Sequence, residues 1–193
     1  SSLRVDAITP GLAGRMAAGG ERSITLAPEA GTPRMREVIN KDFSDDRIVQ
    51  AAADALESGM INVKLYFMCG LPTETDEDVL QIAELAKRVI DTGREVSGRR
   101  DIRCTVSIGG FVPKPHTPFQ WAAQLGAEET DARLDKLRQA LRSDRRYGSA
   151  IGFRYHDGRP GIVEGLPPRG DRRVGRVTLE ARRDGARFHA WRQ

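Results

Sequence analysis

Short runs of β-forming residues alternate with helical patterns along most of this 193-residue chain. The β-rich runs fall at residues 3–6, 23–27, 62–68 and 102–108. Helical patterns lie between or after them, at residues 10–18, 33–39, 44–58, 75–90 and 128–147. Strands separated by helices form parallel βα units rather than hairpins. The sequence therefore predicts an α/β fold with about four parallel βα units, in which chemistry lies in the loops that follow the strands.

Several local signals define these elements. Ser44 is a predicted N-cap, and Thr73 or Thr75 is expected to cap the helix that follows the run at 62–68. That run is nearly continuously apolar apart from Lys64, which predicts a strand covered on both faces. A polar loop is expected at 91–101.

The end of the chain departs from this alternation. We expect residues 1–147 to form the later part of a TIM-like barrel and residues 148–193 to form a short, basic, α-rich extension. A short strand at 151–155 and a helix at 172–183 are compatible with the pattern, whereas Pro167 and Pro168 predict a helix break. Four βα units cannot close a barrel, so we expect a missing N-terminal part of the same polypeptide.

Composition limits where the protein acts. No run of about 18 apolar residues is present, which predicts no membrane span. The two cysteines, Cys69 and Cys104, lie in apolar runs and predict buried free thiols in the reducing cytoplasm. Residues 145–193 contain 12 Arg and 5 acidic residues, a net charge of +7. Such a tail is typical either of a solvated surface or of a site for an anionic partner.

Four segments occur in the order and spacing of a known family. They are residues 25–32 (TLAPEAGT), 38–44 (VINKDFS), 66–75 (YFMCGLPTET) and 111–118 (FVPKPHTP). Together they resemble strand ends of the radical S-adenosylmethionine (radical SAM) superfamily, near the branch that includes methylthiotransferases and enzymes with a cobalamin-type N-terminal domain. The similarity covers roughly residues 2–147 and implies a partial radical SAM barrel.

The resemblance implies that these strand ends form one wall of the SAM pocket. It places Glu29 near the ammonium or ribose of SAM, Lys41 near its carboxylate, and Gly70 with Leu71 near the adenine. Phe111 and Val112 would offer the adenine an apolar surface. Each residue also has a purely structural interpretation, since Glu29 and Lys41 suit exposed loops and Gly70 suits a turn. Glu74 is interpreted first as an acidic residue at a helix N-terminus.

The family's cofactors are only partly accounted for. Its CxxxCxxC motif holds a 4Fe-4S cluster, and the two cysteines of this chain are 35 positions apart, so no cluster ligand is expected here. The resemblance implies a full-length oxidoreductase or transferase that cleaves SAM to a 5′-deoxyadenosyl radical, receives electrons from a flavodoxin or ferredoxin, and acts on an RNA or protein substrate. Cobalamin in the parent stays an open alternative, and this fragment alone is expected to be inactive.

A second interpretation comes from a different class of protein. The basic tail is also compatible with a non-catalytic RNA-binding module, whose affinity would fall steeply as salt rises. The tail's few aromatic residues are not spaced like a base-stacking platform, which argues against sequence-specific RNA recognition.

Overall fold

A computed structural model describes residues 5–155 and 158–186 of the chain. Its elements are η1 (Val5–Ala7), α1 (Pro10–Ala18), β1 (Ser23–Glu29), α2 (Pro33–Val38), α3 (Asp45–Glu57), β2 (Asn62–Cys69), α4 (Asp76–Ser97), β3 (Arg103–Gly110), α5 (Ala127–Ser143), β4 (Ile151–Tyr155), α6 (Gly158–Arg169) and α7 (Arg173–Arg183). The strands form one parallel sheet in the order β1-β2-β3-β4. This topology confirms the predicted α/β class and a partial TIM-like arrangement of βα units.

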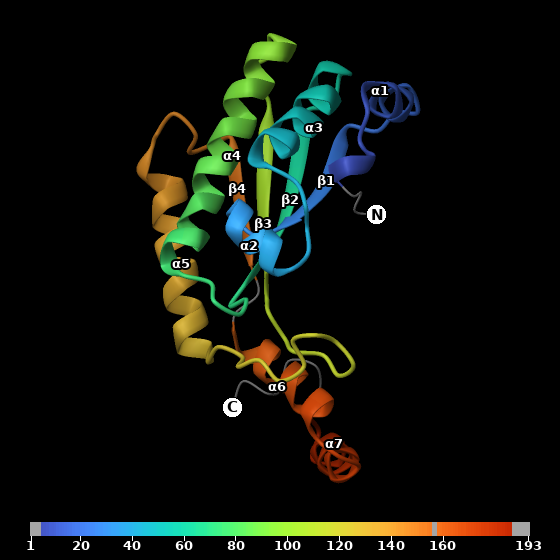
Figure 1. The fold of residues 1–193 in the computed structure, drawn as a ribbon, viewed down its shortest axis with the longest axis vertical. Coiled ribbons are helices and arrows are strands. Elements are labelled where there is room, and N and C mark those ends of the chain that lie inside the picture. The colour runs from blue at the N-terminus through green and yellow to red at the C-terminus, as the bar shows by residue number, and fades with distance from the viewer. Residues whose placement is uncertain (1–4, 156–157, 187–193) are drawn as a thin grey trace.

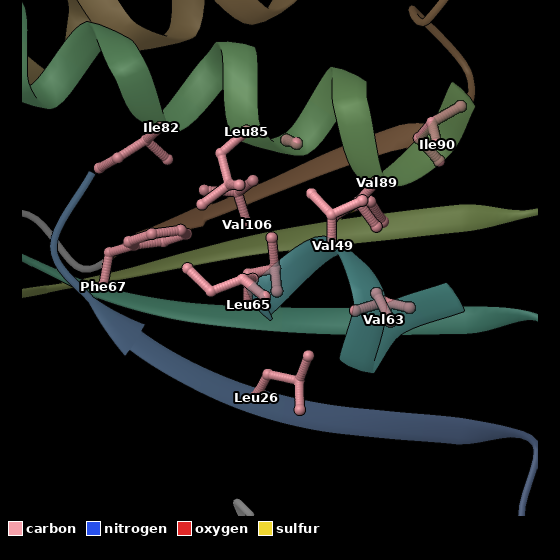
Figure 2. Packing of buried hydrophobic residues seen from close by; sticks show 14 of the residues in the cluster. Leu26, Val49, Val63, Leu65, Phe67, Ile82, Leu85, Val89, Ile90 and Val106 are labelled. Atoms are coloured by element: carbon pink, nitrogen blue, oxygen red, sulfur yellow. The ribbon is translucent and has the colours of Figure 1, made fainter. Parts of the chain in front are cut away.

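The helices α3, α4 and α5 pack on one face of the sheet (Figure 1). Every second strand residue points into this layer, and Figure 2 shows Val63, Leu65 and Phe67 of β2 among the packed side chains of the core. Ile82 and Val89 of α4 meet them from the helix side and are almost fully buried. Burial of apolar area at roughly 25 cal/mol per Å² makes this layer the main source of stability.

The opposite face of the sheet differs from expectation. The residues of β2 that alternate with the core positions include Lys64 and Tyr66, and Tyr66 is 44% exposed. The prediction that residues 62–68 are covered on both faces was therefore wrong, because only the helix-facing side of this parallel sheet is buried.

The predicted helix caps are largely confirmed, whereas the first predicted strand is not. Val5–Ala7 form a 3₁₀ turn rather than part of a strand, and the rest of the run predicted at 3–6 lies outside the described residues. Ser44 caps α3 as predicted, since its hydroxyl accepts a hydrogen bond from the Arg47 N–H at 3.2 Å. Thr75, rather than Thr73, caps α4 through a capping box with Asp78.

The loop predicted at 91–101 and the helix break predicted at Pro167 and Pro168 had different outcomes. The loop prediction was wrong for residues 91–97, since α4 continues to Ser97, and Gly93 within it lies where a Cβ would come within 2.4 Å of Leu56. Gly93 thus permits close packing of α4 on α3. α6 ends at Arg169, directly after Pro167 and Pro168, and α7 begins at Arg173, so the predicted helix break is confirmed. Neither proline has a backbone N–H to donate to the preceding turn, which favours ending the helix here.

The carboxyl ends of the strands point toward the end of the molecule where α6 and α7 lie (Figure 1). β4 pairs with β3 from Cys104↔Ile151 to Ile108↔Tyr155, so the sheet extends past residue 147. α6 is joined to the loop after β3, since Gln124 donates a hydrogen bond to the Gly161 carbonyl at 2.7 Å. In the described part of the chain, no helix is both long and apolar enough to cross a membrane.

Candidate functional site

Three loops meet at the carboxyl edge of the sheet, one each after β1, β2 and β3. Their apolar residues form a small cluster separate from the main core, made by buried Ala30, Met35 and Leu71, with Phe111 and Met68 packed against it. Parallel α/β folds carry their ligands at this edge, and the predicted site residues lie on or beside it.

Glu29 and Lys41 approach each other at this edge. Lys41 Nζ lies 3.7 Å from Glu29 Oε1, and the two side chains are 33% and 27% exposed. Glu29 has a φ of 69°, in the left-handed region that a non-glycine residue adopts at a cost. The register between β1 and β2 shifts between Leu26 and Glu29, so a bulge redirects the end of β1. The pair is therefore accessible and is held on a strained backbone.

Arg36 fixes the loop on which Lys41 lies. Its side chain is fully buried, and it donates hydrogen bonds to the carbonyls of Ala30 and Phe43, each at 3.0 Å. It also pairs with the Asp45 carboxylate at the start of α3. A buried guanidinium whose three nitrogens each donate a hydrogen bond holds the end of β1 and the loop before α3 in one geometry. Nothing in the sequence pattern around Arg36 distinguishes it from a surface arginine.

Asp78 joins the first loop to the second. Its carboxylate accepts a hydrogen bond from the Thr32 hydroxyl at 2.6 Å and from the Thr75 N–H at 2.9 Å, and it pairs with Arg34. Burial raises the pKa of Asp78, but these hydrogen bonds outweigh it and lower the pKa to about 2. Gly31 allows the approach, since a Cβ there would lie 2.2 Å from the Asp78 carbonyl oxygen. Only the spacing of the capping box signals Asp78 in the sequence.

Gly70 and Glu74 form the turn after β2. Gly70 has a φ of 91°, and its N–H donates a hydrogen bond to Glu74 Oε2 at 2.6 Å. The Glu74 side chain is 1% exposed and lies 3.6 Å from Arg133 Nη1 of α5. Burial raises the pKa of Glu74 to about 7, although the Gly70 hydrogen bond and Arg133 act in the opposite direction. Glu74 precedes the helix and clamps its own loop, which differs from the predicted role as a helix N-terminal acid.

Leu71, Phe111 and Val112 contribute apolar surface around this turn. Leu71 is 4% exposed, so its side chain belongs to the small cluster at the edge. Phe111 is half-buried, and its ring packs edge-to-face on Phe119 with centroids 6.1 Å apart. Val112 lies farther along the same loop, where it approaches Gly161 of α6.

The structure thus brings the predicted residues together in two groups. Glu29 and Lys41 form one, and Gly70, Leu71 and Phe111 form the other around the turn after β2. A surface groove of about 610 Å³ lies beside the first group and includes Lys41 but none of the other predicted residues. It is lined by Pro33, Arg34, Glu37, Asn40, Lys41, Asp42, Phe43 and Ser44.

The cysteines are unsuited to metal binding. Cys69 and Cys104 are free and buried, and burial raises the pKa of each thiol to about 12. A metal ligand must be a thiolate, so these protonated thiols are poor donors. Across residues 5–155 and 158–186, no group of three or more His, Cys, Asp or Glu side chains could hold a metal ion.

Comparison with known proteins finds a family match for part of the chain. Residues 2–86 match the Radical SAM superfamily. The matched segment includes β1, β2 and the Glu29–Lys41 pair. The chain is also 41% identical over 120 residues to the "Uncharacterized protein MJ0966" of Methanocaldococcus jannaschii, an alignment that covers 62% of this chain and 24% of the relative. The aligned part of this chain thus corresponds to about a quarter of that protein.

Proposed function

We propose that this chain is the later part of a radical SAM enzyme and supplies one wall of its SAM pocket. The observation that carries the proposal is the accessible Glu29–Lys41 pair at the end of β1, within the segment that matches the superfamily. The turn at Gly70 and Leu71 and the loop at Phe111 and Val112 complete the proposed wall.

The charges of the pair complement the amino-acid end of SAM. A carboxylate suits the ammonium of SAM and a lysine suits its carboxylate, as charge-assisted hydrogen bonds. A separation of 3.7 Å between Lys41 and Glu29 is longer than a direct hydrogen bond, so each group can turn to a ligand at little cost. Gly70 has no side chain and lets a planar ring approach the backbone, while Phe111 offers an apolar surface.

The described residues do not fit an iron–sulfur cluster, because both cysteines are buried and widely separated in sequence. We therefore place the cluster ligands in the longer parent protein. In the superfamily the cluster supplies the electron that cleaves SAM. The residues of this chain would bind and orient SAM, and the helix-covered core would hold them in place.

The finer assignments belong to the same proposal. We place the parent near the methylthiotransferases and the enzymes with a cobalamin-type N-terminal domain, with a flavodoxin or ferredoxin as electron donor and an RNA or protein substrate. The four motifs support this branch. The sequence upstream of residue 1 tests the radical SAM assignment, since that sequence should contain CxxxCxxC. Absence of the motif there would contradict the whole proposal.

Titration of SAM against the parent protein with its cluster reconstituted tests the wall directly. Glu29→Gln and Lys41→Gln should each weaken SAM binding about tenfold or more, because each removes one charge-assisted partner. The matched controls are Glu84→Gln and Lys87→Gln, which break a 2.7 Å ion pair on α4. Equal affinity in the site variants and the controls would refute the assigned roles.

A second candidate function rests on α7. This helix has no buried residue and carries Arg173, Arg176, Arg182 and Arg183 on its surface. Such a helix suits the phosphate backbone of RNA, whether in a separate binding module or in delivery of an RNA substrate. RNA affinity should fall steeply between about 50 and 200 mM salt. Binding that is absent or insensitive to salt would eliminate this candidate.

A further inference from the structure

The sheet face that carries no helix layer has a distinctive composition. We call it the open face and define it by the strand residues that alternate with core positions. They are Ser23, Thr25, Ala27, Asn62, Lys64, Tyr66, Met68, Arg103, Thr105, Ser107, Gly109, Gly152 and Arg154. Apart from Glu29, which follows the bulge in β1 and is left out of the set, these positions contain three cations and no carboxylate. The open face is therefore a basic surface lined with hydroxyl groups.

Among the residues that the structure describes, the cations of the open face have no acidic partner. Within residues 5–155 and 158–186, none of the ion pairs includes Lys64, Arg103 or Arg154. At the carboxyl edge the opposite holds, since Lys41 pairs with Glu29 and Arg36 pairs with Asp45. Charge on the open face is thus available to a ligand.

The register concentrates donors at one place on this face. Tyr66, Ser107 and Arg154 occupy one row across β2, β3 and β4, and neighbouring strands lie about 4.8 Å apart. Lys64 lies in the preceding row, two residues and roughly 7 Å back along β2. The long side chains of Lys64 and Arg154 can therefore reach a common point above Ser107.

Glycines keep this place free of side chains. Gly152 shares the row of Lys64, and Gly109 follows Ser107 by two residues on β3. A Cβ at Gly109 would meet no atom within 4 Å, and one at Gly152 would meet only Thr105, at 3.6 Å or more. The strand backbone therefore forms an unobstructed floor beside the Ser107 hydroxyl.

We propose that this part of the open face binds a phosphate group of the substrate, with Lys64 and Arg154 as the charged donors and Tyr66 and Ser107 as hydroxyl donors. Phosphate has three terminal oxygens and up to two negative charges, which matches two separate cations and two hydroxyls. A carboxylate would be satisfied by one arginine alone. The inference rests on the proposed function in one respect, namely that barrel closure would make this face the interior of the enzyme.

Amide chemical shifts in the ¹⁵N-labelled 193-residue chain test the inference with inorganic pyrophosphate as the probe. We expect saturable shifts at Ser107, Gly109 and Gly152. Lys64→Gln and Arg154→Gln should each weaken binding several-fold, and the double variant about tenfold or more. Arg100→Gln/Arg142→Gln removes two exposed charges away from this face and should leave binding unchanged.

Three results would overturn the inference. These are an equal loss in both double variants, shifts confined to α7, or tighter binding of tricarballylate than of pyrophosphate. Circular dichroism verifies that each variant is folded. If the double variant is unfolded, the binding affinities of the two single variants are compared instead. SAM cleavage by the reconstituted parent without added substrate is a separate readout, so failure of phosphate binding alone leaves the proposed function intact.

Discussion

The two faces of the parallel sheet differ in polarity and burial, although the same four strands form both. The helix-covered face is apolar, and residues such as Leu65 and Val106 are completely buried there. The open face is polar and basic, and Tyr66 on it is 44% exposed. Adjacent residues of one strand thus have different roles. Those on the helix-covered face stabilise the fold, and ligand binding is proposed for those on the open face. Substitutions at neighbouring positions can separate these two roles.

The largest effect is expected from a pair of adjacent residues on β2. Phe67→Ala should lower the free energy of unfolding by about 3–5 kcal/mol, because Phe67 is 2% exposed within the core. Tyr66→Ala, one residue away on the open face, should lower it by less than about 1 kcal/mol. Urea denaturation measures both. Similar losses for the two variants would show that the open face is also packed.

The next effect tests whether the carboxyl edge is as firmly built as the core. Arg36→Met should lower the free energy of unfolding by about 2–4 kcal/mol, because it leaves two carbonyls and the Asp45 carboxylate without their buried partner. Arg88→Met is the matched control, since Arg88 also reaches Asp45, at 3.8 Å, but is 45% exposed. The control should lose less than about 1 kcal/mol in the same denaturation experiment. A loss for Arg36→Met no larger than the control's would contradict a structural role for this arginine.

A third prediction concerns the pH dependence of stability. The pKa of Glu74 is about 7 in the folded chain against an ordinary value of 4.5, so the folded state holds the proton more tightly. Its contribution to stability is fully present below pH 4.5 and is lost as pH rises through 7, by roughly 3 kcal/mol. Glu74→Gln should remove this fall, since glutamine does not titrate and can still accept the Gly70 hydrogen bond.

Thermal denaturation between pH 4 and 8 measures the effect. Glu129→Gln is the control, because Glu129 also pairs with Arg133 but is 58% exposed. The Glu129→Gln variant should retain the loss of stability with rising pH that the unsubstituted chain shows. A Glu74→Gln variant with an unchanged pH profile would show that another group titrates over this range.

The smallest effect has the opposite sign. Glu29→Gly should raise the free energy of unfolding by up to about 1 kcal/mol, because glycine adopts a φ of 69° without strain. Asn40→Gly, at a φ of 57°, should gain less, since asparagine tolerates this region better. The same Glu29→Gly change should weaken SAM binding in the parent. Improved stability with unchanged SAM affinity would show that the backbone strain at Glu29 is unrelated to SAM binding.

Much of the sheet and its helices follows from the sequence because a buried face imposes a period on it. The stripe of Val79, Ile82, Ala86 and Val89 predicts α4, and the structure places all four in the core. Exposed positions impose no such period, so Lys64 and Tyr66 were assigned to a doubly covered strand. The continuation of α4 through Gly93 was likewise not predicted, since the packing of Gly93 against Leu56 depends on a contact distant in sequence.

The candidate site divides in the same way. Glu29 and Lys41 are recognisable because they lie in motifs at strand ends, and the structure places them 3.7 Å apart. Arg36 carries no local signal, because its partners are backbone carbonyls whose positions depend on the folded loop. Glu74 was assigned to the helix, since sequence spacing alone does not reveal that a side chain folds back onto Gly70.

The polar contacts at the carboxyl edge also determine how the molecule comes apart. Arg34 of the first βα unit pairs with Asp78 of the second, and Arg133 of the third pairs with Glu74 of the second. Opening any one unit would expose or orphan a buried charge belonging to its neighbour. These units should therefore not fray one at a time, as the modules of a solenoid do, but exchange their amide protons in a single cooperative event.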